Sequence, residues 1–337
     1  MEDLVQKWKD GKLKWVQISW FVHKRLIEQE FYLRTGSYQW SQVWKGEVKH
    51  FNEVRDKLTT DYDIIQINLS GQDMHLPNLV REMLDKAGNK HTKIIVNLDY
   101  TVELWQQSFE YIHTIKDSLR GADMIFGTEH HMVNAMQVLT GRKIYLTPHP
   151  CHVKRLKSLR SKRKLPIVSV VWHRYDNNAM LPSLLAKDLG KKIRLIGYEE
   201  MSDRKKFCTQ TMYDDFLGAT NYMSFCEQLQ ESDVVIEPFT LTTHGRTTID
   251  CAGMGIPVIG SNRVESCRRC YPYTTFDPWD IKEGRELLKK VLNDKEFREK
   301  VINTAQENVE YYNHDNCRSR IFDFLEKGSY KLKDEDV

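Results

Sequence analysis

A polar loop between two apolar runs carries the residue types that bind a phosphate group. Residues 233–238 predict a buried strand and residues 257–261 predict another. The loop between them is rich in Thr and Gly and leads into a short predicted helix that begins near Thr247. Unpaired N–H groups and the positive end of the helix dipole meet at a helix N-terminus and favour an anion. The candidate phosphate ligands are Thr247, Thr248 and the backbone at Gly245 and Arg246.

Asp250 lies three residues inside that predicted helix and adds a second kind of contact. Its carboxylate would stand beside the bound anion and accept charge-assisted hydrogen bonds from two hydroxyls of a ribose. The alternative is an acid that only stabilises the helix dipole. Arg246 either neutralises phosphate or points to solvent. A phosphate beside a ribose predicts a site for a nucleotide sugar.

The elements that must position this loop alternate between strand and helix along the whole chain. The predicted strands are residues 14–21, 63–69, 93–98, 122–126, 143–146, 166–172 and 192–197, besides the two that flank the loop. Helical spacing of apolar residues separates them, for example at 76–87, 102–119, 131–139, 179–189 and 223–230, and continues at 281–292, 294–312 and 319–327. This alternation predicts an α/β fold with parallel sheets covered by helices on both faces.

The best predicted domain boundary follows the two prolines of residues 147–150, where a basic stretch, KRLKSLRSKRK, lacks an apolar face. A chain of 337 residues exceeds the usual size of a single core. We expect an N-terminal Rossmann-like domain (1–150), a basic linker (151–165), a C-terminal Rossmann-like domain (166–315) and a C-terminal helix and tail (316–337). Two such halves that face each other leave a cleft at the carboxyl ends of both sheets, where α/β sheets bind ligands.

The composition, 40% hydrophobic and 29% charged, is typical of a globular protein, and a net charge of +3 does not mark a nucleic-acid binder. We find no apolar run long enough for a transmembrane segment and no signal peptide, so we expect a cytoplasmic protein. Its seven cysteines, an odd number, are expected to be reduced. Cys267 and Cys270 form a lone C-x-x-C with no second pair of zinc ligands nearby, and they are interpreted as two thiols in a loop.

The second half resembles the nucleotide-binding domain of glycosyltransferases with the GT-B fold, most closely the retaining family 4. The resemblance rests on Phe216 to Phe239, which ends in Glu-Pro-Phe, on TTIDCAGMGIPVIGS at residues 247–261, and on the helices of residues 277–312. The segment LTPHPCHVKRL at residues 146–156 is similar to the interdomain connector of that family. The match spans residues 146–314 in order and spacing, whereas the first half lacks the glycine-rich loop that usually follows the first strand.

The resemblance implies that residues 1–150 form the acceptor domain and residues 166–315 form the nucleotide-sugar donor domain. It also implies roles for further residues. Asp250 takes the position of the ribose-binding acid, His173 and Arg174 would offset the charge of the leaving diphosphate, and Asp99 would face the sugar as an orienting group or a base. The nucleobase would be flanked by Gly197, Tyr198, Asn221, Tyr222 and Met223.

One position departs from the family. The second glutamate that is usual there falls on Thr242, while Glu237 lies thirteen residues before Asp250. Either Glu237 still contacts the donor across a longer loop, or Thr242, Thr243 and His244 hold the sugar instead.

The resemblance implies transfer of a sugar from a nucleoside diphosphate sugar to an unidentified acceptor, with retention, without a metal and without a cofactor. The acceptor classes that stay open are a glycan, a lipid-linked compound, a small molecule and modified DNA. Three alternative hypotheses for the function stay open. They are a glycosyltransferase that acts on modified DNA bases, a nucleotide-sugar epimerase or hydrolase, and a non-catalytic module that binds a nucleotide or nucleic acid. The run from Lys154 to Lys164 is either a solvated linker or a surface for nucleic acid or anionic lipid.

Overall fold

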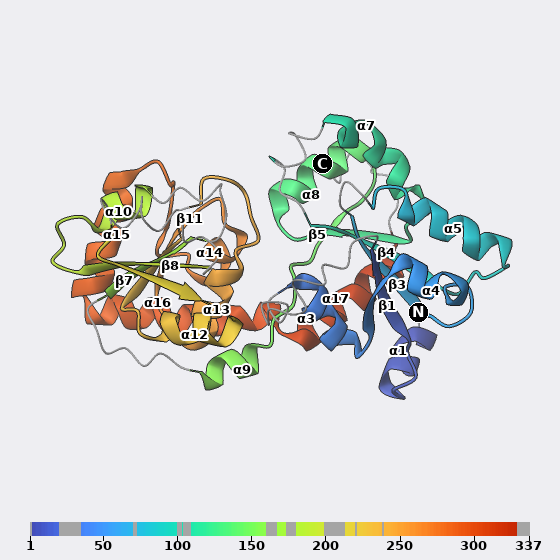
Figure 1. Ribbon diagram of the computed structural model, residues 1–337, viewed down its shortest axis with the longest axis horizontal. Helices are drawn as coiled ribbons and strands as arrows, with labels where there is room; N and C mark the ends of the chain where they lie inside the picture. Colours follow the sequence, from blue (N-terminus) through green and yellow to red (C-terminus); the bar gives the residue numbers. More distant parts are fainter. Residues whose placement is uncertain are drawn as a thin grey trace. The chain divides into compact units, whose positions relative to one another are not determined.

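The computed structural model describes residues 2–19, 35–69, 73–99, 103, 109–159, 167–172, 180–198, 213–219, 221–237 and 239–328. The chain divides into two compact units (Figure 1). Unit 1 comprises the described residues up to Pro150 together with those from His314 onward, and unit 2 comprises those from Cys151 to Asn313.

Unit 1 is built on a six-stranded sheet in the order β2-β1-β3-β4-β5-β6, in which all neighbouring strands are parallel. Its strands are β1 (Trp15–Ser19), β2 (Glu47–His50), β3 (Ile64–Leu69), β4 (Lys93–Leu98), β5 (Met124–Gly127) and β6 (Tyr145–Leu146). One face is covered by α4 (Phe51–Val54), α5 (Leu76–Lys86), α7 (Phe109–Ser118) and α8 (His130–Thr140). The other is covered by α1 (Glu2–Lys9), α3 (Gly36–Trp44) and α17 (His314–Lys327).

The two faces of β3 show how the sequence produces these layers. Successive side chains of a strand point to opposite faces. Ile65 and Ile67 therefore join the core under α5, whereas Ile64 packs with the indoles of Trp40 and Trp44 from α3. Burial of large apolar side chains on both faces stabilises each layer.

Unit 2 repeats the plan with a six-stranded parallel sheet in the order β12-β11-β10-β7-β8-β9. Its strands are β7 (Ile167–Trp172), β8 (Lys192–Tyr198), β9 (Asp215–Ala219), β10 (Val234–Glu237), β11 (Val258–Ser261) and β12 (Thr275–Phe276). One face is covered by α10 (Met180–Ala186) and α15 (Ile281–Asn293). The other is covered by α9 (Val153–Ser158), α12 (Tyr222–Gln230), α13 (Arg246–Met254), α14 (Glu265–Cys270) and α16 (Lys295–Asn308).

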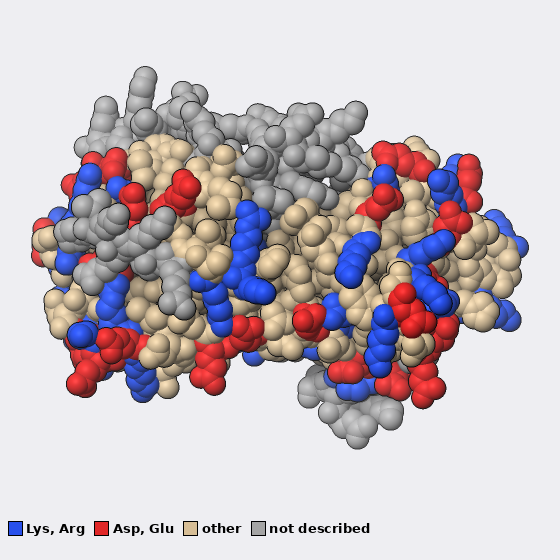
Figure 2. Space-filling view, turned by 90° about the horizontal axis from the view of Figure 1, so that it is seen from below, with Lys and Arg blue, Asp and Glu red and all other residues tan. Residues whose placement is uncertain are grey.

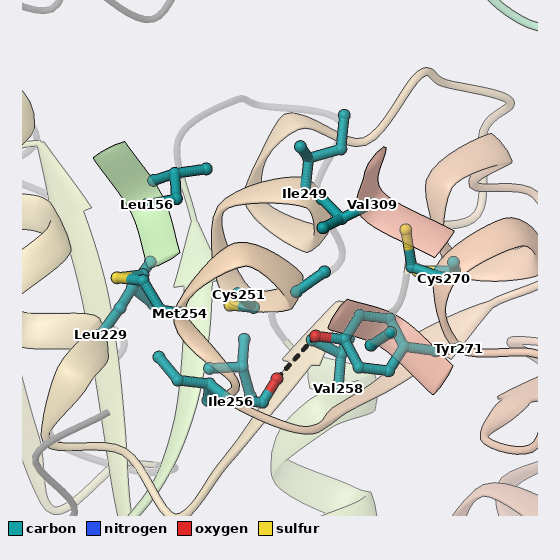
Figure 3. Packing of buried hydrophobic residues seen from close by; sticks show 14 of the residues in the cluster. Leu156, Leu229, Ile249, Cys251, Met254, Ile256, Val258, Cys270, Tyr271 and Val309 are labelled. Atoms are coloured by element: carbon teal, nitrogen blue, oxygen red, sulfur yellow. Dashed lines mark hydrogen bonds between the residues drawn. The ribbon is translucent and has the colours of Figure 1, made fainter. Parts of the chain in front are cut away.

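Helix α13 lies at the centre of the second layer. Figure 3 shows Ile249, Cys251 and Met254 of this helix among apolar side chains from the surrounding elements. Tyr271 closes one side of this core, where its hydroxyl donates to the carbonyl of Ile256 at 2.6 Å. Helix α13 is therefore packed within a buried apolar core.

The two sheets with helices on both faces confirm the predicted α/β class. Some elements differ from the sequence expectation, which did not include β2, β9 and β12. Residues 153–158, expected in a linker, form α9, because Val153 and Leu156 are buried and Leu156 fills the space left by the missing side chain of Gly253. The last helix, expected over residues 319–327 within a C-terminal helix and tail from residue 316, begins at His314 and packs in unit 1 through Cys317, Ile321 and Leu325.

Candidate functional site

The predicted phosphate loop lies at the carboxyl end of β10, in the middle of the unit 2 sheet. From β7 the chain continues through β8 and β9 toward one edge, and it then returns to β10, β11 and β12 on the other side. The strand order therefore reverses between β7 and β10. Open α/β sheets bind ligands outside the carboxyl ends of strands at such a switch point. Glu237 ends β10 there, and α13 begins at Arg246 after the loop.

The loop has a fixed backbone because the segment after β11 holds it. The N–H of Thr243 donates to the carbonyl of Arg263 at 3.1 Å, and the N–H of Ser266 donates to the carbonyl of His244 at 3.2 Å. The hydroxyl of Ser266 donates to the carbonyl of Gly245 at 2.7 Å. Thr242 is buried in the same loop. These hydrogen bonds hold the segment TLTTHGR against residues 263–266 of unit 2.

Gly245 caps the N-terminus of α13 in a left-handed conformation, with φ of +79°, and no side chain caps the helix. A Cβ at this position would overlap Val264 and Ser266. Only glycine combines this φ with such a close approach. A helix N-terminus gathers backbone N–H groups and the positive end of the helix dipole, so the first turn of α13 suits an anion.

Asp250 is fully buried one turn inside α13. Its Oδ1 accepts a hydrogen bond from the hydroxyl of Tyr222 at 2.8 Å and from Nε of Arg246 at 3.0 Å. Burial raises the pKa of Tyr222 well above its usual value and the charge of Asp250 raises it further, so the phenol remains a donor. The structure thus brings together three predicted residues, and they bind one another. Contact of Asp250 with a ribose stays a prediction.

Glu237 is buried at the end of β10, and its carboxylate accepts a hydrogen bond from the hydroxyl of Thr248. That hydroxyl also lies 3.2 Å from the sulfur of Cys267 on α14. Burial raises the pKa of the Cys267 thiol, and the charge of Glu237 adds to the shift. Glu237 therefore ties β10 to the first turn of α13. Its contact with a donor sugar stays a prediction.

The segments predicted to flank the nucleobase end at the same edge of the sheet. Gly197 pairs with Gly218, and Tyr198 pairs with Ala219, at the carboxyl ends of β8 and β9. Asn221 caps α12 by accepting from the N–H of Ser224 at 2.8 Å. Met223 is half-buried, and its sulfur lies 3.0 Å from Nη2 of Arg155. His173 and Arg174 follow β7 and lie outside the described residues.

Asp99 follows β4 in unit 1, and its Oδ1 lies 2.6 Å from Nε2 of His149. The side chain of Asp99 is 42% exposed and that of His149 only 10%. Gly36, the first residue of α3, lies so close to the imidazole that a Cβ would overlap it. The sequence did not assign His149 to a site, because this residue and its partner are fifty positions apart.

The cysteines of the described residues are buried thiols. Cys267 and Cys270 belong to α14, so the expected loop around them is a helix. Burial raises the pKa of both thiols. The described residues contain no group of three or more His, Cys, Asp and Glu side chains that could hold a metal ion. Among the same residues, no helix has the length and apolar character needed to cross a membrane.

Part of the basic run from Lys154 to Lys164 is described, as far as Leu159. Lys154 and Arg155 are exposed on α9, whereas Nζ of Lys157 pairs with the carboxylate of Glu310 at 2.5 Å. Figure 2 shows Lys and Arg side chains interspersed with Asp and Glu across the visible face.

Solved structures share this architecture over nearly the whole chain. Sucrose-phosphate synthase from Thermosynechococcus elongatus matches with a TM-score of 0.70 at 13% identity, covering 94% of this chain and 98% of the other. HepE from Anabaena, in complex with UDP and glucose, matches with a TM-score of 0.67 at 11% identity, covering 94% and 100%. The chain has the GT-B fold. The GT-B prediction made from the sequence is therefore confirmed, whereas membership of family 4 stays a prediction.

A third GT-B structure is an α-glucosyltransferase in complex with UDP and a 13-mer DNA containing a modified base. It matches with a TM-score of 0.62 at 11% identity and covers 93% of this chain and 99% of the other. No protein-family model matches the sequence, and no curated protein sequence matches it. Likeness at these identities establishes the GT-B fold, and activity must be argued from the site.

Proposed function

We propose that the protein is a GT-B glycosyltransferase that transfers a sugar from a UDP-sugar held in unit 2. The observation that carries the proposal is the correspondence of both units, over 94% of the chain, with HepE in complex with UDP and glucose. The loop before α13 supports it independently, because it leads into the N-terminus of that helix at the switch point of the sheet.

In this proposal the diphosphate binds at the first turn of α13. Gly245 gives the loop the left-handed turn that leads into the helix, and the N–H groups of the first turn donate to the phosphate oxygens. Departure of the diphosphate concentrates negative charge there, and fixed dipoles and cations stabilise such charge best in a water-poor site. Arg174 and His173 follow β7 and are proposed to add positive charge. The ribose hydroxyls bind beside Asp250, whose carboxylate the hydroxyl of Tyr222 holds in place.

Calorimetric titration with UDP, GDP, ADP and CMP tests the donor site. We expect UDP to bind and the Asp250→Ala variant to lose most of that binding. Asp233→Asn is the matched control, because Asp233 is also buried and paired, with Arg298 at 3.1 Å, but precedes β10 at its opposite end. If none of the four nucleotides binds, or if both variants lose UDP affinity equally, the proposed donor site in unit 2 is wrong.

Incubation with a panel of UDP-sugars, followed by NMR, tests catalysis. We expect slow release of free sugar from one donor, with the released anomer matching the donor, and no change of rate with EDTA. Formation of an isomeric UDP-sugar would identify an epimerase instead. Binding of UDP without any turnover would indicate a non-catalytic nucleotide-binding module.

DNA as the acceptor is a second candidate, supported by the α-glucosyltransferase in complex with DNA and by exposed Lys154 and Arg155 on α9. Fluorescence anisotropy with a single-stranded oligonucleotide tests it. If DNA is the acceptor, the affinity for the oligonucleotide falls steeply as the salt concentration rises, and the Lys154→Glu variant binds the oligonucleotide more weakly. An absence of binding at low salt removes the candidate.

A further inference from the structure

A second segment of unit 2 runs beside the last residues of the phosphate loop, from Val264 to Ser266. Thr243 and Val264 form an isolated parallel bridge. The N–H of Glu265 donates to the carbonyl of Thr243 at 2.9 Å, and the N–H of Ser266 donates to the carbonyl of His244 at 3.2 Å. These bonds join backbone atoms, so they hold the loop without depending on the side chains that it carries.

The hydroxyl of Ser266 adds a side-chain bond at the point where the loop becomes helix α13. It donates to the carbonyl of Gly245 at 2.7 Å, and Gly245 directly precedes Arg246, the first residue of the helix. A peptide group is planar and trans, so its N–H points away from its C=O. The bond that holds the carbonyl of Gly245 therefore also fixes the direction of the N–H of Arg246.

The backbone at Gly245 needs such a bond, because glycine has no Cβ and its own dihedral angles resist rotation less than those of other residues. Gly245 is buried, and a buried carbonyl that loses its donor turns toward another donor or toward water. The N–H of Arg246 would tilt with that carbonyl, since both belong to one plane. A hydrogen bond weakens as it departs from linearity, so a phosphate bound at this N-terminus would lose affinity.

Ser266 can hold this peptide because α14 is anchored by contacts of its own. Ser266 is fully buried in the first turn of α14. The next residue, Cys267, packs against β11, where a Cβ at Gly260 would overlap its sulfur. The same sulfur lies 3.2 Å from the hydroxyl of Thr248, inside the first turn of α13. Helix α14 therefore contacts the start of α13 at two points, the carbonyl of Gly245 and the side chain of Thr248.

We propose that Ser266 is a positioning residue of the donor site, which holds the N-terminus of α13 in the orientation that binds the diphosphate. The inference rests on the proposed function, because it takes the first turn of α13 as the place of the diphosphate. The hydroxyl proton of Ser266 is used on Gly245, so Ser266 acts through that carbonyl rather than on the ligand. Ser266 therefore raises the affinity for the phosphate groups of a nucleotide and leaves the affinity for a neutral nucleoside unchanged.

NMR titration of the full chain with UDP and with uridine tests the proposal, and the readout is the ratio of the two dissociation constants. We expect the wild-type protein to prefer UDP, and Ser266→Ala to lower that preference by about tenfold while uridine binds as before. The backbone amide signal of Arg246 should also shift in Ser266→Ala without ligand. Ser266→Thr retains the hydroxyl and should keep the preference for UDP. Ser232→Ala is the matched control, because Ser232 is also fully buried and its hydroxyl donates to Ser169 at 2.7 Å, before the amino end of β10.

Ser266→Cys is a second variant for the case in which Ser266→Ala does not fold, since a thiol is a weaker donor than a hydroxyl and should also lower the preference for UDP. If the affinities for UDP and uridine fall together, Ser266 only stabilises the fold and the proposal is overturned. A preference for UDP that survives loss of the hydroxyl, or that falls equally in Ser232→Ala, rejects this inference alone. A wild-type protein that binds UDP no more tightly than uridine contradicts the proposed donor site itself.

Discussion

Arg246 and Asp250 form an ion pair one helical turn apart, with 3.0 Å between Nε and Oδ1, and the carboxylate is fully buried. The hydroxyl of Tyr222 donates to the same oxygen atom at 2.8 Å. The first turn of α13 is thereby joined to α12 through a single acceptor atom. The charge of Asp250 is balanced within unit 2 before any ligand binds.

Replacing Asp250 with Ala leaves the guanidinium of Arg246 without this carboxylate in a largely buried place. Loss of one partner from a buried ion pair costs about 3–5 kcal/mol in the free energy of unfolding. Urea unfolding measures this cost. Asp294→Ala is the control, because Asp294 caps the exposed start of α16 and its loss costs about 1 kcal/mol. Equal costs for the two variants would show that Asp250 makes no special contribution to stability.

Gly245→Ala should be far more damaging than the same change at Gly141. Both glycines have positive φ, +79° and +66°, so each substitution carries a backbone cost of about 1–2 kcal/mol. Only at Gly245 would the new Cβ also overlap Val264 and Ser266, whereas it meets nothing within 4 Å at Gly141. Thermal unfolding compares their stability, and UDP titration compares their binding. If the two variants lose equal stability and both bind UDP, the close packing of the loop has no consequence.

The sequence predicted those parts of the fold and site that local patterns determine. Apolar runs such as residues 234–237 between turn-forming residues predict buried strands, and Gly245 followed by Thr247 and Thr248 predicts a helix start. The spacing of Arg246 and Asp250 suits an ion pair on one helical face. Asp250 was instead interpreted as a ligand of the ribose and Arg246 as either a phosphate contact or a solvent-exposed side chain, since nothing in the spacing indicates that Tyr222 meets them.

The remaining features depend on contacts between distant residues. His149 meets Asp99 because β4 and the segment after β6 end at the same edge of the sheet, and no periodicity marks that meeting. The hydrogen bonds that Gln66 and Asn97 donate to Asn68 likewise need the register of β3 and β4. Helix α3 was not predicted, because its aromatic side chains Trp40 and Trp44 suit a strand as well as a helix.

His149→Ala should lower the rate of donor hydrolysis or transfer while leaving UDP affinity unchanged. Removal of the imidazole frees Asp99 to rotate, and a misoriented acid costs activity without touching a nucleotide in unit 2. His149→Gln retains a side-chain N–H and should recover part of the rate. Rates over a range of donor concentrations, together with UDP titration, separate turnover from binding. Equal rates in the wild-type protein and His149→Ala would remove Asp99 and His149 from the proposed reaction.

Stability should fall as the pH rises above about 8.5, the ordinary pKa of a thiol. Burial raises the pKa of Cys267 and Cys270, and raises the pKa of Cys317 to about 12. Below about pH 8.5 the thiols are protonated in both the folded and the unfolded chain. Above it the unfolded chain releases protons that the folded chain retains, so the free energy of unfolding decreases by about 1.4 kcal/mol per pH unit for each thiol.

Urea unfolding at pH 7, 8, 9 and 10 under reducing conditions measures this slope. Cys317→Ala is the diagnostic variant, because it removes one buried thiol near the end of the chain and should reduce the slope above about pH 8.5 by one thiol's share. At pH 7 the free energy of unfolding of this variant falls only because packing is lost. That packing cost is the same at every pH. The explanation by buried thiols fails if the variant and the wild-type protein lose stability in parallel from pH 8 to pH 10.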